Sequence, residues 1–310
     1  MATLICGSFA FDSIMVFSGR FKDHILPDQV HILNVSFLVP TLRREFGGCA
    51  GNIAYSLALL GGSPLPMATV GDDCQPYLDH LDRLGIDRRF VRQIPGTLTA
   101  QAFITTDLDD NQITAFHPGA MSHSHLNAIE PRGLELGILG PDGREGMLLH
   151  ARQMSEAGIP FVFDPGQGMP MFEAAELDSF IERAHYLALN DYEAKLMAAK
   201  TGSDPQALAR RLKAVVVTLG ALGSRIWADG TIVEIPAAPA RIVRDPTGCG
   251  DAYRAGLLYG ISHEMDWPTT GRLASVMGAL KIEHSGAQRH TPSRAQIEER
   301  FLEAFGYRPW

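Results

Sequence analysis

The sequence has few cysteines, no strongly basic segment and no long apolar run. Its four cysteines, Cys6, Cys49, Cys74 and Cys249, are scattered and form no CxxC pair, which argues against a disulfide framework and a cysteine-based zinc site. The formal net charge is -8 without any run of Lys or Arg, so broad binding to nucleic acid or to anionic membranes is not expected. No apolar run approaches the ~20 residues of a membrane-spanning helix, and the first residues lack the basic part of a signal peptide. The expected compartment is therefore the cytoplasm.

Two common nucleotide-binding motifs are also missing. No GxxxxGK[ST] segment occurs, which excludes a Walker-type phosphate loop. The glycines near the N-terminus do not form a GxGxxG at the start of the first helix, which argues against a dinucleotide-binding fold. An anionic ligand such as ATP must then be held by other local donors and a metal ion.

The chain of 310 residues is 45% hydrophobic, enough to bury a full core. Short apolar runs that end in Gly, Asp or Asn predict strands at Thr3–Cys6, Leu65–Val70, Pro160–Asp164, His185–Leu189 and Ala214–Leu219. Amphipathic or apolar spacing predicts helices at Asn52–Leu60, Gln75–Leu84, Asp191–Lys200, Asp204–Lys213, Asp251–His263, Gly271–His284 and Ser293–Phe305. This alternation predicts an α/β fold in which a mainly parallel central sheet is flanked by helices.

Two stretches break the alternation because they predict strands without intervening helices. They are Val30–Val39 and Ala100–Phe116, the second with a hairpin turn at Asp107–Asn111. We expect them to form a small β-sheet lid, built from roughly 13–40 and 97–118, within a single domain that spans 1–310. No tandem repeat or Pro/Gly/Ser linker divides the chain.

The strongest chemical signal is the segment Asp245–Tyr253, where a glycine-flanked turn runs into a helical pattern. Gly248 and Gly250 allow a tight turn, so that the N–H groups of Gly248, Cys249 and Gly250 can converge on a phosphoryl group at the positive end of the helix. Asp251 lies in the first helical turn, where the helix dipole favours its ionised form, and it can accept a proton from a substrate hydroxyl. The alternative is an ordinary capped helix without any function.

A second glycine-rich turn, at Gly47–Gly51, opens a helix that begins with Asn52. Close approach of a ligand to this backbone, with Asn52 as donor and acceptor for hydroxyl groups, is one interpretation. Close packing of helix against strand is the other. Asp12 follows the first strand and could accept hydrogen bonds from two neighbouring hydroxyls, or could cap a turn.

Two further segments follow predicted strands at the edge where α/β sheets bind ligands. Val215–Gly223 ends in two glycines, which suits a nucleotide loop or a simple hairpin. Asn190 and Glu193 could project towards phosphates and Mg²⁺ or its waters, or could form a helix capping box. The residues alone leave these alternatives open.

Together, the four segments resemble the PfkB, or ribokinase-like, carbohydrate kinase family over nearly the whole chain. The resemblance implies a three-layer α/β fold with a β lid, Gly248–Gly250 as anion hole and Asp251 as catalytic base. It also implies Mg²⁺ at the Asn190–Glu193 element, with Glu193 acting directly or through water. The residues implied to contact ATP are Asn190, Thr218, Gly220 and Gly223. A K⁺ ion is implied near Asp245, Thr247 and Gly286.

Two departures from the family pattern occur. Cys249 stands where many relatives carry alanine, but only its backbone N–H is needed. The loop Asp164–Pro170 contains no Lys or Arg, whereas relatives frequently carry an arginine there that helps to hold the transferred phosphate. The sequence does not show what replaces it.

Within the family, the bacterial adenosine kinases look closest, because of the spacing of the polar and glycine residues near the N-terminus and because of the lid segment Asn111–Met121. This similarity implies the following nucleoside contacts: ribose at Asp12, Gly48 and Asn52, Ser8 and Ser36 nearby, and Phe103 and Phe116 against the purine. Aromatic stacking suits a purine face, although alternate strand residues also form lid core by default.

The expected reaction is ATP plus adenosine giving ADP plus AMP. A ribokinase- or fructokinase-like sugar kinase is the alternative, a catalytically silent sensor is disfavoured, and monomer or homodimer is left open.

Overall fold

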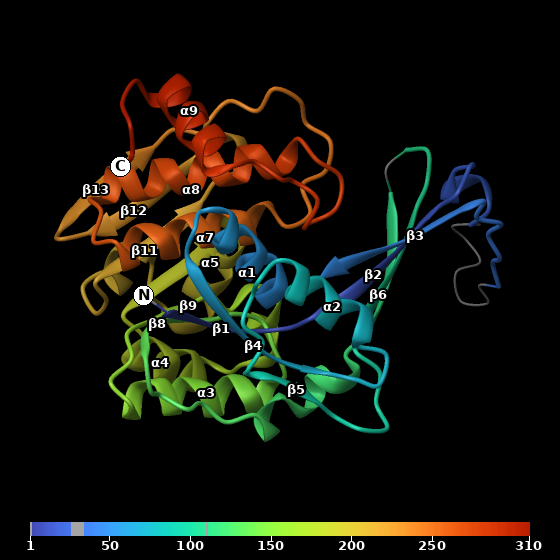
Figure 1. The fold of residues 1–310 in the computed structure, drawn as a ribbon, viewed down its shortest axis with the longest axis horizontal. Helices are drawn as coiled ribbons and strands as arrows, with labels where there is room; N and C mark the ends of the chain where they lie inside the picture. The colour runs from blue at the N-terminus through green and yellow to red at the C-terminus, as the bar shows by residue number, and fades with distance from the viewer. Residues whose placement is uncertain (1, 26–33, 110) are drawn as a thin grey trace.

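The computed structural model describes residues 2–25, 34–109 and 111–310, which form a large sheet, a small sheet and helices on both faces of the large sheet (Figure 1). The large sheet has the strand order β13-β12-β11-β10-β9-β8-β1-β4-β5. Its strands are β1 (Ala2–Cys6), β4 (Ser63–Val70), β5 (Val91–Gln93), β8 (Leu134–Leu139), β9 (Phe161–Phe163), β10 (Tyr186–Asn190), β11 (Ala214–Thr218), β12 (Ser224–Ala228) and β13 (Thr231–Ile235). Pairing from β5 to β11 is parallel, and β12 and β13 complete the sheet as an antiparallel hairpin.

The central strands are apolar on both faces because helices cover both. In β11, Val215 and Val217 contribute to one buried core, whereas Ala214 and Val216 contribute to the other. Successive side chains of a strand point to opposite faces, so a continuous apolar run is what a doubly covered parallel strand requires. This confirms the mainly parallel α/β fold that the sequence predicts.

Each face of the sheet carries its own layer of helices. One core includes residues of α1 (Cys49–Leu59), α2 (Gln75–Arg83), α7 (Cys249–Ser262), α8 (Trp267–Ile282) and α9 (Arg294–Phe305). The other includes residues of α3 (Arg144–Glu156), α4 (Ala174–Arg183), α5 (Asp191–Thr201) and α6 (Pro205–Leu208). Short 3₁₀ segments occur at Phe21–Asp23, Gly119–Leu126, Gly166–Met171 and Gly220–Leu222. The architecture therefore has three layers.

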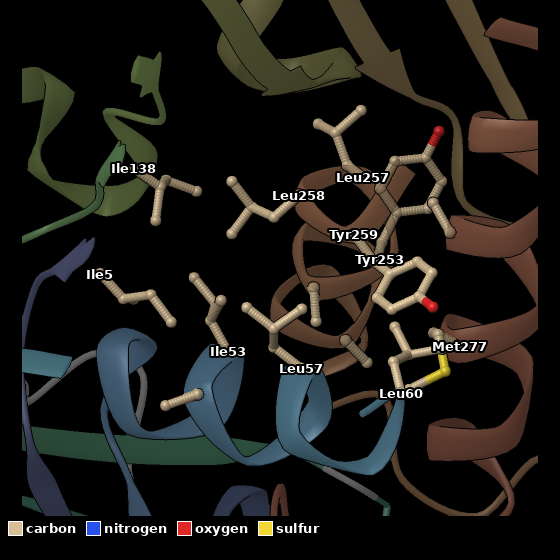
Figure 2. Packing of buried hydrophobic residues seen from close by; sticks show 14 of the residues in the cluster. Ile5, Ile53, Leu57, Leu60, Ile138, Tyr253, Leu257, Leu258, Tyr259 and Met277 are labelled. Atoms are coloured by element: carbon tan, nitrogen blue, oxygen red, sulfur yellow. The ribbon is translucent and has the colours of Figure 1, made fainter. Parts of the chain in front are cut away.

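Helices α1 and α7 pack against each other through fully buried side chains. Figure 2 shows Ile53 and Leu57 of α1 facing Leu258 of α7, with Ile5 of β1 and Ile138 of β8 beside them. Burial of such side chains stabilises by about 1.5–3 kcal/mol each. This contact fixes the relative position of the two helix N-termini, where the glycine-rich segments lie.

The small sheet projects from one side of the molecule and forms the lid (Figure 1). It has the order β3-β2-β6-β7 and consists of β2 (Ala10–Val16), β3 (Thr41–Gly47), β6 (Ala100–Thr106) and β7 (Gln112–His117). The strand predicted at 30–39 is wrong for 34–39, which form no strand, and 30–33 lie outside the described residues. In this segment Phe37 packs on Phe17 and Phe21 instead, and the strand begins only after Pro40, which cannot donate to a ladder.

Another difference concerns the helix predicted at Asp204–Lys213, which is only α6, four residues long. The chain has to turn back after Leu208, because Lys213 donates its N–H to His185 O and the strand β11 starts at Ala214.

Among the described residues, no helix is long and apolar enough to cross a membrane.

Candidate active site

The predicted polar residues gather at the carboxyl edge of the large sheet. Ser8 follows β1 after one residue, Asp164 follows β9 directly, and Asn190 and Thr218 are the last residues of β10 and β11. These strands are parallel, so their carboxyl ends meet at one edge, which is where open α/β sheets bind ligands.

Asp251 lies in the first turn of α7, and its Oδ2 accepts a hydrogen bond from Asn52 Nδ2 at 2.8 Å. The helix can start here because Gly248 has φ 77°, a left-handed conformation, and because a Cβ on it would lie 2.7 Å from the Ala287 Cβ. Burial raises the pKa of Asp251 to about 6, opposed by the Asn52 hydrogen bond and supported by the charge of Asp164. The expectation that the helix dipole favours the ionised form is therefore outweighed by desolvation.

The backbone N–H groups of Gly248, Cys249 and Gly250 are not all free to bind an anion. Cys249 N donates to Pro246 O at 3.1 Å, so this N–H group is already used in a hydrogen bond within the turn. For Gly248 N and Gly250 N, no backbone acceptor occurs in the part of the chain that the structure describes. Gly250 is exposed, and a Cβ built on it meets no atom within 4 Å. The predicted anion hole therefore has its open side at Gly250.

Asn52 belongs to a hydrogen-bonded network that the sequence did not reveal. Gln288 Nε2 donates to Asn52 Oδ1 at 2.9 Å and to Tyr77 Oη at 2.8 Å, and Tyr77 donates to Gly47 O. The amide of Asn52 is thereby oriented with its donor towards Asp251. No local motif surrounds Gln288 or Tyr77, so sequence reasoning had no signal for either.

Asp12, on the lid strand β2, lies beside the other glycine-rich turn. A Cβ on Gly47 would lie 2.4 Å from Asp12 Oδ2, so a larger residue at this position would displace the Asp12 carboxyl. Burial raises the pKa of Asp12 to about 6, and the charge of Glu45 adds to the effect. Asp12 is also close enough to raise the pKa of Asp251. The structure thus brings two partly buried carboxyls to one site.

Three other residues in the N-terminal part of the chain, Ser8, Ser36 and Gly48, were also predicted to lie near the nucleoside, and they occupy different positions in the structure. Gly48 is the N-cap of α1, and Ser8 Oγ accepts the N–H of Cys49 at 3.3 Å, so both lie at this helix start. Ser36 is exposed and belongs to no strand. It lies in the irregular segment before β3, whereas Ser8 and Gly48 lie at the start of α1.

Phe103 and Phe116 lie on opposite faces of the lid sheet. Phe116 pairs with Ala102 across β6 and β7, and Ala102 pairs with Asp12 across β2 and β6. Directly paired residues share a face, so Phe116 lies on the face of Asp12, whereas Phe103 lies on the other. Strand register therefore separates the two rings, so a purine on the face of Asp12 would meet Phe116 and not Phe103.

A cleft of about 560 Å³ runs from the β11–β12 connection to the start of α7. Its lining includes the predicted nucleotide residues Thr218, Gly220 and Gly223 together with Cys249 and Gly250. Apolar side chains such as Val243, Ala279 and Ile282 form other walls. The glycines form the turn of an antiparallel hairpin, and this turn also lines the cleft.

Asn190 and Glu193 form a reciprocal capping box at the start of α5. Asn190 Oδ1 accepts the N–H of Glu193 at 2.7 Å, and Glu193 Oε2 accepts the N–H of Asn190 at 2.8 Å. Burial raises the pKa of Glu193, and the charge of Asp164 adds to it. Among the described residues, no cluster of three His, Cys, Asp or Glu side chains could hold a metal by itself. Carboxylates with a free oxygen suit Mg²⁺ that keeps waters and phosphate ligands, so this donor set fits Mg²⁺ held together with ATP.

Arg254, one helical turn after Asp251, supplies the positive charge that the loop Asp164–Pro170 lacks. Its Nε and Nη2 donate to the two oxygens of Asp164 at 3.1 and 3.0 Å, and the pair is buried. Arg254 Nη1 is also buried and has no hydrogen-bond partner in the described structure. No sequence motif singles out Arg254, although its spacing of three from Asp251 places both side chains on one helix face.

An apolar cleft that ends at an open helix N-terminus, beside a carboxyl able to take a proton, defines the class of α/β kinases that act on small hydroxyl compounds. The model of the pfkB family of carbohydrate kinases matches residues 11–294. The chain belongs to this family.

Similar proteins include nucleoside kinases from three organisms. The enzyme of Burkholderia thailandensis in complex with inosine has a TM-score of 0.90 and 56% identity over 99% of both chains. Its complex with ADP-inosine has a TM-score of 0.88 and 59% identity over 99% of this chain and 97% of that one. That of Methanocaldococcus jannaschii has a TM-score of 0.90 and 28% identity over 97% and 98%. The nucleoside kinase of Methanothermobacter thermautotrophicus is 31% identical over 99% of this chain and 97% of its own length.

Proposed function

We propose that this protein transfers the γ-phosphoryl group of ATP to the 5'-hydroxyl of a purine nucleoside, with adenosine among its acceptors. The products are the nucleoside 5'-monophosphate, which is AMP when adenosine is the acceptor, and ADP. The observation that carries the proposal is Asp251, held by Asn52 at the point where the cleft meets the start of α7. The similarity to nucleoside kinases over nearly the full chain supports a nucleoside as acceptor.

In the proposed reaction, Asp251 accepts the proton of the 5'-hydroxyl while the 5'-oxygen of the nucleoside forms a bond to the γ-phosphorus. The bond from the γ-phosphorus to the bridging oxygen of ADP breaks, and ADP leaves with that oxygen. A base with a pKa of about 6 is mostly ionised at neutral pH, and a weak base is sufficient because phosphoryl transfer depends mainly on positioning and charge stabilisation.

The negative charge of the transferred group is met by the open N–H of Gly250 and by the guanidinium of Arg254. Arg254 Nη1 is buried without a partner, and a buried donor without a partner costs about 1–3 kcal/mol. A phosphoryl oxygen would satisfy it. Mg²⁺, with Glu193 and the phosphates as ligands, would neutralise further charge.

The nucleoside lies between the sheet edge and the lid. Asp12 accepts hydrogen bonds from ribose hydroxyls, and Phe116, on the same lid face, lies against the purine. Closure of the lid excludes water, which would otherwise take the phosphoryl group.

The test is ADP release with ATP and Mg²⁺, comparing adenosine, inosine, ribose and fructose as acceptors. Preference for adenosine and inosine is expected. Preference for ribose or fructose would replace the proposal by a sugar kinase of the same family, and absence of turnover with every acceptor would favour a silent sensor.

A further inference from the structure

Lys281 of α8 is a fully buried lysine whose ammonium group is held by backbone oxygens. Its side chain has 0% exposure. Nζ donates to Asp245 O at 2.7 Å and to His284 O at 3.1 Å. A buried charge of this kind is costly unless it is hydrogen-bonded and paired, so its position calls for a functional reason.

The ammonium group lies beneath the turn that opens the catalytic helix. Asp245 is the first residue of the segment that leads to Asp251, and Gly278, one turn before Lys281 on α8, approaches Cys249 O. Burial lowers the pKa of Lys281, and the charges of Asp245 and Asp251 oppose this by favouring the protonated lysine. His290 also faces this region, and burial lowers its pKa to about 3, so its ring stays neutral.

The oxygens of Asp245 are all engaged. Besides the carbonyl that accepts from Lys281, Oδ1 accepts the N–H of Thr247 at 2.9 Å and Oδ2 accepts the N–H of Gly286 at 2.7 Å. The family resemblance implies a K⁺ ion in this neighbourhood. These residues do not fit it, because backbone N–H groups and an ammonium ion already occupy the oxygens, and the ammonium would repel a second cation.

We propose that the ammonium group of Lys281 is a tethered monovalent cation, which takes the place of K⁺ and holds the turn from Asp245 to Cys249 in the conformation that receives the phosphoryl group. Lys281 is thus a positioning residue, which acts through Asp245 and contacts no substrate. A compact ammonium with three donors suits a pair of carbonyl oxygens, and carbonyl oxygens are also what protein sites use to replace the hydration of K⁺. The proposal rests on the kinase function and adds that turnover does not require an added monovalent cation.

The experiment compares the wild-type protein with two substitutions of the same residue. Lys281→Ala removes the ammonium and leaves an empty space between two carbonyls, whereas Lys281→Met fills most of that space with an uncharged chain. Lys200→Ala is the matched control, because Lys200 also donates to a backbone carbonyl, Phe172 O, at 2.8 Å, but on α5. Turnover and thermal unfolding are measured in K⁺, NH₄⁺, Na⁺ and tetramethylammonium at equal ionic strength.

Wild type and Lys200→Ala should turn over equally, within about twofold, in all four salts, and Lys281→Ala should lose at least about tenfold in kcat. K⁺ or NH₄⁺ should restore Lys281→Ala and raise its unfolding temperature above the value in tetramethylammonium, but should not affect Lys281→Met. A wild-type enzyme that needs K⁺ would overturn the proposal. So would a Lys281→Ala variant whose unfolding temperature is the same in all four salts. The unfolding measurement involves no acceptor, so it decides the role of Lys281 even if the proposed nucleoside acceptor is wrong.

Discussion

Asn52 Nδ2 donates to Asp251 Oδ2 across 2.8 Å, and this hydrogen bond joins the first turns of α1 and α7 although 199 residues separate the two in the chain. It orients the carboxyl that we propose as the acceptor of the substrate proton. Asn52, predicted as a ribose contact, therefore has a second role that only the structure reveals.

Asp251→Asn should lower kcat by about 10²–10⁴, because it removes the proton acceptor, while ATP binding is retained. The same variant should be more stable than wild type at neutral pH by at most about 3 kcal/mol, because the pKa of Asp251 is raised from 3.8 to about 6 in the folded protein. Kinetics and thermal unfolding test the two parts. Unchanged turnover would refute the assigned role.

The pH dependence of stability and of turnover follows from the Asp251 carboxyl. A carboxyl with a raised folded pKa loses its proton at a cost to stability, so the stability gain of Asp251→Asn should grow from about pH 4 to about pH 6 and stay constant above. In the wild type, kcat/KM should fall as the pH drops through about 6, where Asp12 also titrates. Asp12→Asn should make this fall less steep. A flat rate from about pH 5 to about pH 8 would contradict both assignments.

Phe116→Ala should raise the KM for adenosine by about tenfold, because a stacked aromatic ring is lost. Phe103→Ala is the matched control, since its ring lies on the other face of the same sheet, and should change KM by less than about twofold. Equal effects of the two substitutions would argue against the register-based assignment.

Arg254→Met should lower both stability and kcat. Loss of one partner from the buried pair with Asp164 costs about 3–5 kcal/mol, because the carboxylate is left unpaired. The double variant Arg254→Met/Asp164→Leu should regain most of the stability but not the activity. If activity returns along with stability, Arg254 serves the fold alone.

Gly250→Ala should reduce turnover or raise the KM for ATP by about tenfold without loss of stability. A Cβ there enters open space at the phosphoryl end of the cleft and displaces the ligand rather than the protein. Gly248→Ala should instead unfold at lower temperature, because its φ of 77° and its contact with Ala287 exclude a side chain. Unchanged kinetics in Gly250→Ala would place the phosphoryl group elsewhere.

Local patterns were sufficient for the central strands and for the glycine-rich segments, but not for residues 34–39, which form no strand, nor for the length of the helix after Asp204. A parallel strand buried on both faces needs an apolar run such as Ala214–Thr218, and a helix that opens on a ligand needs glycine before it, as at Gly248. Both are properties of neighbouring residues. For this reason the α/β fold and the segment around Asp251 could be predicted from the sequence by itself.

The tertiary structure decided which distant residues pair and on which face of the lid sheet each side chain lies. Arg254 pairs with Asp164 over 90 residues, and Gln288 orients Asn52 over 236, distances that no local spacing encodes. The register of the lid strands places Phe116, and not Phe103, on the same face as Asp12. Burial, which depends on every layer around the site, raises the pKa of Asp251 against the helix dipole. The sequence determined which residues could do the chemistry, and packing decided which of them lie together and in which state of charge.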